Sequence, residues 1–126
     1  LEHFKRDEFM VVLKDWYKTL KTGGILRISV PCMEALAEYY LETKDLDRQL
    51  LGLLYGDQGS PYSYHYHIWD YKTMEKDLKE AGFRMVQRWD WREVDHKYID
   101  DHSQAYMPHM DKVRGKLMSL NVEAIK

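Results

Sequence analysis

A polar and aromatic stretch, Tyr62-Ser63-Tyr64-His65-Tyr66-His67-Ile68-Trp69, carries the most candidate chemistry in this 126-residue sequence. Tyrosine rings can stack on a small molecule, and a histidine beside them can orient it. We therefore predict a substrate-binding loop formed by Tyr64, His65, Tyr66 and His67. Plain packing of these rings is the alternative interpretation.

The spacing His65-x-His67 does not predict a metal site. Two imidazoles leave a tetrahedral zinc ion incompletely coordinated, and Cys32 is the only thiol in the chain. Cys32 has no evident base beside it in sequence, so a nucleophilic role is unsupported. We expect no metal ion.

A second group of carboxylates and imidazoles follows between Arg92 and Gly115. Such groups bind metals or act as acids and bases, but they also serve as caps and turns in a solvated loop, which is the interpretation we favour. The residues of this group are Asp95, His96, Asp100, Asp101, His102 and His109.

Composition limits the class of protein. Apolar residues make up 44% of the chain and charged residues 32%, which fits one globular domain over residues 1–126. A net charge of -2 disfavours nucleic acid as a partner, and no apolar run is long enough to span a membrane. A single cysteine fits a reducing, cytoplasmic location.

Hydrophobic spacing predicts the elements that position these residues. A helix starts near Lys5 and ends at Gly23-Gly24, a strand runs from Ile25 to Val30, and Pro31 ends it. Further helices are predicted at 33–41, at 46–54 and, between Asp70 as N-cap and Gly82 as C-cap, at 71–81.

Two further strands are predicted. The first spans 83–91, with Trp89 to Arg92 alternating between core and surface. The second spans 117–125, and its apolar face holds Met118, Leu120, Val122 and Ala124. Within the helix at 33–41, the inner face is predicted to hold Met33, Leu36, Ala37, Tyr40 and Leu41. The order of elements predicts an α/β fold with parallel pairing early in the chain and an antiparallel final pair.

The helix and strand junctions resemble those in the second half of class I S-adenosylmethionine-dependent methyltransferases. The resemblance rests on Leu1-Glu2-His3-Phe4, on Leu20-Lys21-Thr22-Gly23-Gly24-Ile25-Leu26 with Ile28-Ser29-Val30-Pro31, and on Leu78-Lys79-Glu80-Ala81-Gly82-Phe83. It spans residues 1 to about 91. The family often has Pro at Thr22 and commonly Asp at Cys32.

The resemblance implies a partial Rossmann-like fold. Residues 25–30, 117–125 and 83–91 would be strands five, seven and six of the family, with strand seven antiparallel between the other two. The family's first four strands, its glycine-rich turn and its ribose-binding acid would be missing. We therefore expect the isolated chain to bind S-adenosylmethionine weakly or not at all.

The resemblance also implies roles for individual residues. The segment Leu1, Glu2 and His3 would border the methionine part of the cofactor. His3 and His67 are the catalytic candidates, since a histidine can accept a proton from the methyl acceptor. Cys32 would contact the acceptor, because it ends a strand on the side where α/β sheets bind ligands. An exposed terminal histidine is the alternative for His3.

The predicted function is methyl transfer to a small-molecule acceptor, incomplete in this chain. The alternative is a non-catalytic module that self-associates or binds a protein through an open sheet edge. Because strand four would be missing, Ile25 to Val30 would expose unpaired backbone groups, and we expect a homodimer through this strand.

Overall fold

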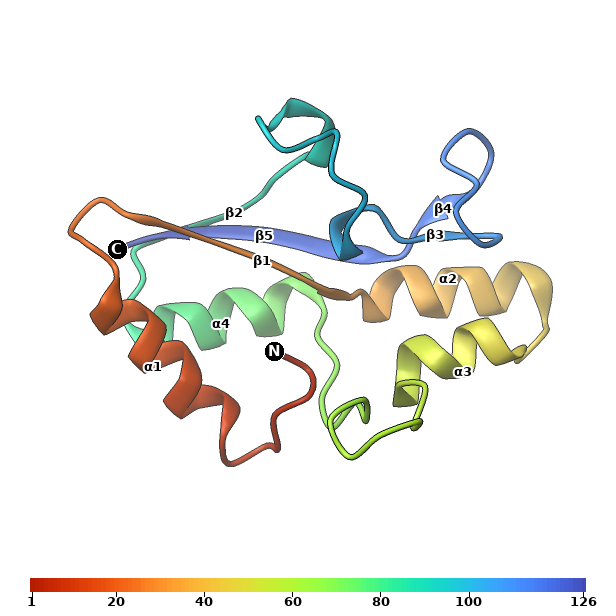
Figure 1. The fold of residues 1–126 in the computed structure, drawn as a ribbon, viewed down its shortest axis with the longest axis horizontal. Helices are drawn as coiled ribbons and strands as arrows, with labels where there is room; N and C mark the ends of the chain where they lie inside the picture. The colour runs from red at the N-terminus through yellow and green to blue at the C-terminus, as the bar shows by residue number, and fades with distance from the viewer.

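A three-stranded sheet forms the centre of the computed structural model, which describes all residues from Leu1 to Lys126. Its strands are β1 (Ile25–Pro31), β5 (Ser119–Ile125) and β2 (Met85–Arg88), in that spatial order. The helices are α1 (Phe9–Thr19), α2 (Met33–Thr43), α3 (Arg48–Tyr55) and α4 (Tyr71–Ala81). Helices α1 and α4 cover one face of the sheet, while α2 and α3 lie beyond the carboxyl end of β1 (Figure 1).

Both strand pairs are antiparallel. Val30 of β1 lies opposite Leu120 of β5, and Arg88 of β2 lies opposite Val122. The central, antiparallel position expected for the C-terminal strand is confirmed, whereas the parallel pairing expected early in the chain is wrong. Strands β1 and β2 run in the same direction, but β5 lies between them and takes the hydrogen bonds of both.

The apolar face of β5 packs into the core. Met118, Leu120, Val122 and Ala124 are fully buried, as their alternation predicts. Trp69, at the end of the aromatic stretch, is also fully buried, and its indole N–H donates to Asp77 of α4 at 2.8 Å. The aromatic stretch is thereby anchored beneath the sheet.

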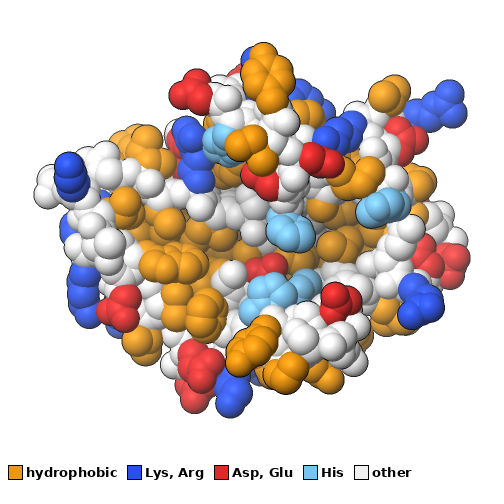
Figure 2. Space-filling view, viewed as in Figure 1, with side chains coloured by type: hydrophobic (Ala, Val, Ile, Leu, Met, Phe, Trp, Pro, Cys, Tyr) orange, Lys and Arg blue, Asp and Glu red, His pale blue; other side chains and the backbone are white.

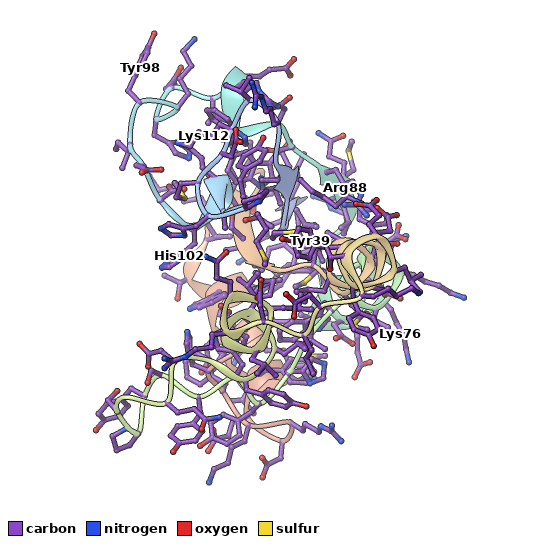
Figure 3. All side chains as sticks on the ribbon, turned by 90° about the vertical axis from the view of Figure 1, so that its right-hand side faces the viewer. Tyr39, Lys76, Arg88, Tyr98, His102 and Lys112 are labelled. Carbon is purple, nitrogen blue, oxygen red and sulfur yellow. The ribbon has the colours of Figure 1, made fainter.

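The polar face of β5 is covered as well. The chain from Trp89 to Ala105 folds over it and includes the short helices η1 (Trp91–Glu93) and η2 (His102–Gln104) (Figure 1). Asn121 donates from its side-chain amide to the carbonyl of Ser103 at 2.9 Å, and Ser119 donates to the carbonyl of His102. Tyr98 projects from the tip of this segment (Figure 3). The segment from Trp89 to Ala105 therefore covers the second face of the sheet.

Several predicted boundaries are wrong. The first helix begins at Phe9 because residues 5–8 form a turn. The strand predicted at 83–91 spans only Met85–Arg88, so the predicted alternation of Trp89 to Arg92 along a strand is wrong. The strand predicted at 117–125 begins at Ser119, because β4 (Lys116–Leu117) pairs instead with β3 (Tyr106–Met107).

The predicted inner face of α2 is confirmed only in part. Leu36 is buried as predicted and Ala37 is half-buried, whereas Met33, Tyr40 and Leu41 are exposed and Ala35 is buried instead. The helix lies at the end of the sheet and contacts the β4 strand there, so only a narrow face is covered. No helix of the protein has the length and apolarity needed to cross a membrane.

A polar ladder links the three strands. Glu123 of β5 lies opposite Arg27 of β1 and Gln87 of β2, and it accepts hydrogen bonds from both, at 3.0 and 2.7 Å. The hydrogen bond from Gln87, together with the interactions of Arg27, outweighs burial and lowers the pKa of the Glu123 carboxyl below its usual value of 4.5. The folded state therefore favours the ionised carboxylate.

We expect Glu123→Gln to lower the free energy of unfolding by about 1 kcal/mol at pH 7, because two charge-assisted hydrogen bonds become neutral ones. A depressed carboxyl pKa stabilises the fold above the unfolded-state pKa, and this contribution is lost as the pH falls through the folded-state pKa. The difference between wild type and variant should therefore shrink below pH 4.5 in urea unfolding. Glu80→Gln, at an exposed position on α4, is the control. An equal difference at pH 3 and pH 7 would contradict the prediction.

Candidate functional site

A hollow of about 530 Å³ lies at the carboxyl end of β1. Five segments line it: the N-terminal residues, β1, α3 with the loop that follows, the region around η2, and the start of β5. The lining residues are Leu1, Glu2, His3, Ser29, Val30, Pro31, Gly52, Leu53, Gly56, Asp57, Ser63, His65, His102, Ala105, Met118 and Ser119. Histidine side chains gather near the middle of this face of the molecule (Figure 2).

The N-terminal segment is held against the aromatic loop. The N–H of Tyr66 donates to the carbonyl of Glu2 at 2.8 Å, and Nδ1 of His3 lies 3.1 Å from the carbonyl oxygen of Tyr64. The Glu2 carboxylate lies 2.9 Å from the N-terminal ammonium and 3.8 Å from Nε2 of His3. These contacts place Glu2 and His3 on one wall of the hollow.

The end of α3 positions His65. Gly56 ends the helix with φ of 77° and ψ of 173°, and the chain returns so that the N–H of His65 donates to the carbonyl of Tyr55 at 3.0 Å. Nδ1 of His65 lies 2.8 Å from the carbonyl oxygen of Leu53. The ring of His65 therefore meets the ring of His3 edge to face, with centroids 4.8 Å apart.

The other predicted loop residues lie elsewhere. Of the four that were expected to converge on one concavity, only His65 lines the hollow. His67 packs against Phe9 and Trp69, with ring centroids 4.7 and 4.1 Å apart, and burial lowers its pKa. Tyr64 and Tyr66 are partly exposed and stack on each other. The expected convergence of all four is wrong, because the half-buried His67 packs against Phe9 and the buried Trp69 instead.

Cys32 also lies outside the lining of the hollow. Its side chain is buried, and its backbone N–H donates to the carbonyl of Met118 at 2.8 Å, extending the pairing of β1 with β5. The thiol contacts the Glu34 carboxylate at 3.9 Å. Contact between Cys32 and an acceptor therefore stays a prediction.

Acidic side chains outnumber basic ones in the hollow. Its lining contains the carboxylates of Glu2 and Asp57 and no lysine or arginine, and the Leu1 ammonium pairs with Glu2 at 2.9 Å. Burial raises the pKa of the Glu2 carboxyl, but the charge and hydrogen bond of the N-terminal ammonium outweigh it, so the pKa lies below its usual value. Hydrogen bonds from Ser63 and from the Gly59 N–H lower the pKa of Asp57. Both groups are ionised near neutral pH and favour a cationic ligand.

A second hollow, of about 480 Å³, adjoins the first and shares Asp57 and His102 with it. Asp100, Asp101 and His109 line it, so part of the second predicted polar cluster gathers there. Two of its carboxylates have structural partners, since Asp101 caps η2 through the Ser103 N–H and Asp100 pairs with Lys112. These contacts agree with the caps and turns expected for that cluster.

Sequence reasoning missed three contributors to the first hollow. Neither Asp57 nor a pairing of His3 with His65 is predicted from the sequence, and His102 is placed there only in the second polar group. The Gly56-Asp57 pair directly before an aromatic loop was the available signal for Asp57. Comparison with protein-family models, with curated proteins and with solved structures finds no match to this chain.

Proposed function

We propose that this chain is the C-terminal half of a class I S-adenosylmethionine-dependent methyltransferase domain, and that it supplies one wall of the site where a small-molecule acceptor is methylated. The observation that carries the proposal is the strand order β1-β5-β2, with the last strand in the middle and antiparallel to both neighbours. The family resemblance implies this order for strands five, seven and six. The sequence features that carry the resemblance also lie at the appropriate junctions.

The two glycine junctions support this assignment. Gly23, with φ of 77°, lies in the turn between α1 and β1, and Gly82, with φ of 115°, caps α4 before β2. Phe83, which follows the second glycine, is buried in the core. Gly82 ends α4 in a left-handed conformation, whereas α1 ends at Thr19 with Leu20 as its C-cap, so the predicted helix end at Gly23-Gly24 is wrong and Gly23 serves the turn into β1.

The position of the N-terminal segment also supports it. Strand β1 is at one edge of the sheet. Leu1 lines the first hollow together with Ser29 of β1, and it also lines an apolar depression formed in part by Leu26 and Ile28. A strand leading into Leu1 would therefore reach the open edge of β1, where strand four of the family pairs with strand five.

The residues present fit one end of the cofactor. S-adenosylmethionine carries its transferable methyl group on a positively charged sulfur, and the first hollow presents the Asp57 carboxylate, together with Glu2 paired to the Leu1 ammonium, and no lysine or arginine. Its volume lies within the range of small-molecule sites. Leu1, Glu2 and His3 would face the methionine end, whereas ribose and adenine contacts would come from strands outside these 126 residues.

His3 and His65 would act on the acceptor. Each ring directs Nδ1 at a backbone carbonyl oxygen, which can only accept a hydrogen bond, so Nδ1 carries the proton and Nε2 keeps a free lone pair. That atom can orient an acceptor hydroxyl or amine and take its proton as the methyl group moves. His67, the other catalytic candidate, would position the loop through its contacts with Phe9 and Trp69.

Calorimetric titration with S-adenosylmethionine tests the proposal. The 126-residue chain alone should bind weakly or not at all, whereas a longer chain that includes the upstream coding sequence should bind with a micromolar dissociation constant, about -8 kcal/mol. In the longer chain, Glu2→Gln should weaken binding and His109→Gln, an exposed position outside the first hollow, should not. A folded longer chain that does not bind would refute the proposal, and so would micromolar binding by the short chain.

The open edge of β1 favours a second candidate function, that of a non-catalytic module that associates with a copy of itself. In an antiparallel pair, the backbone groups of successive residues point alternately toward and away from the partner strand. The Cys32 N–H donates to the Met118 carbonyl on the β5 side, so the backbone groups of Arg27 and Ser29 point to the open edge of the sheet. These groups have no hydrogen-bond partner. A start codon adjoining Leu1 would favour this module, and upstream sequence with a strand followed by glycines would favour the methyltransferase.

A further inference from the structure

We propose that Glu2, His3 and His65 bind one divalent transition-metal ion, and that their chemistry suits zinc. One ligand atom from each of the three side chains lies within 4.8 Å of the others, on the wall of the first hollow. The three ligands all lie within this chain, and a bound ion would occupy the Nε2 lone pairs that the proposed function gives to the methyl acceptor, so the two roles exclude each other in one molecule.

The two imidazoles are oriented as metal ligands. A metal-binding histidine usually donates its second ring N–H to a carbonyl or carboxylate, which fixes the tautomer and the direction of the ring. His3 directs Nδ1 at the Tyr64 carbonyl at 3.1 Å, and His65 directs Nδ1 at the Leu53 carbonyl at 2.8 Å. Both Nε2 atoms therefore keep a lone pair for a metal ion.

The third ligand is a carboxylate held in place. Glu2 is largely buried, and the Tyr66 N–H fixes its backbone by donating to the Glu2 carbonyl at 2.8 Å. Its Oε1 atom lies 3.8 Å from Nε2 of His3 and remains available to a cation. Glu2 and His3 are adjacent in sequence, while His65 reaches the site because the aromatic loop runs beside the N-terminal segment.

The distances between the three ligand atoms would suit a small ion once the side chains move closer together. Ligand atoms bound to tetrahedral zinc at about 2.1 Å lie roughly 3.4 Å apart. The largest separation between ligand atoms must therefore fall by up to about 1.4 Å, which the His3 ring can achieve because 43% of its side chain is exposed. Two histidines and a carboxylate with an open fourth position form a ligand set that zinc accepts.

The surroundings favour a cation. Asp57 adds a second negative charge to the hollow, and no lysine or arginine lines it. The site differs from the pair considered in the sequence, because the partner of His65 is His3, whereas His67 packs against Phe9 and Trp69.

Calorimetric titration of the metal-free chain, carrying no polyhistidine tag, with Zn²⁺ tests the site. We expect one ion per chain, and we expect His3→Ala, His65→Ala and Glu2→Gln each to lower the association constant at least tenfold. His109→Ala, at an exposed histidine outside the first hollow, should bind as the wild type does. Circular dichroism identifies any variant that fails to fold.

Titration with Co²⁺ gives a second readout, because a tetrahedral site produces visible absorption bands that should be lost in His3→Ala, the variant least able to disturb the fold. Failure of the folded wild-type chain to bind either ion would overturn the proposal. Wild-type affinity in His3→Ala and Glu2→Gln would overturn it equally. The titrations contain no S-adenosylmethionine, so their outcome is independent of the cofactor experiment.

Discussion

Replacing Gly56 with alanine is expected to lower the free energy of unfolding by about 3 kcal/mol or more. Gly56 ends α3 with φ of 77° and ψ of 173°, a backbone conformation that is essentially restricted to glycine. A Cβ atom there would overlap the carbonyl oxygen of Ser63 and lie 2.8 Å from its carbonyl carbon. Both atoms belong to the backbone, so a side-chain rotation cannot relieve the overlap.

Gly56→Ala is also expected to disturb the geometry of the candidate site. The same turn brings the N–H of His65 to the carbonyl of Tyr55 and the His65 ring to the carbonyl of Leu53. Moving Ser63 away from Gly56 would therefore displace His65 from His3, and Gly56→Ala should weaken zinc binding as well as the fold.

Gly52→Ala is the matched control. Gly52 lies inside α3, and no atom lies within 4 Å of the Cβ that alanine would add. This variant should be more stable than wild type by about 0.5–1 kcal/mol, because alanine loses less backbone entropy in a helix. Urea unfolding measures both variants. Gly56→Ala with the stability of wild type would show that α3 does not end in this turn.

The second prediction concerns self-association, and its expected result is that Ser29→Pro converts a homodimer into a monomer. The wild-type chain should associate as a two-fold dimer in which β1 pairs with β1 of its partner. Arg27 is the only charged residue in β1, and Pro31 lies at its end, so the open edge has little protection against pairing. An apolar depression beside Leu26, lined also by Trp16 and Leu20 of the α1 region, would extend the contact.

Ser29→Pro should act on the open edge alone. The Ser29 N–H points away from β5, so proline at this position removes a donor from the edge without removing a hydrogen bond of the β1–β5 pair. We expect the dissociation constant of the dimer to rise at least a hundredfold. Light scattering at high concentration should then give the monomer mass of 15.2 kDa for the variant and twice that value for wild type.

Thr22→Pro provides the control. The Gly24 N–H donates to the Lys21 carbonyl at 2.8 Å, and Gly23 has φ of 77°, so residues 21–24 form a turn that accepts proline at its second position. This variant introduces a proline outside β1 and should remain dimeric. A monodisperse wild-type monomer would contradict the prediction, since the open edge would then not suffice for association.

The sequence by itself determined the elements that depend on local signals. Asp70 accepts from the Thr73 N–H and Gly82 takes a left-handed conformation, as their types and positions around α4 predict. The alternation of apolar residues identified the buried face of β5, and Pro31 ends β1 as predicted. These features follow from backbone propensities and from hydrophobic periodicity, both of which act over a few neighbouring residues.

Tertiary structure decided the features that depend on partners distant in the chain. Strand β2 is shorter than its sequence pattern suggests because the chain turns away from β5 after Trp89, where Asp90 caps η1. The polar face of β5 is buried because the segment around η2 supplies carbonyl acceptors to Ser119 and Asn121. His3 meets His65 because the N-terminal segment and the aromatic loop hydrogen-bond to each other, while the burial of Trp69 carries His67 away from them. No periodicity encodes these contacts, since each is fixed by the packing of segments that are separate in sequence.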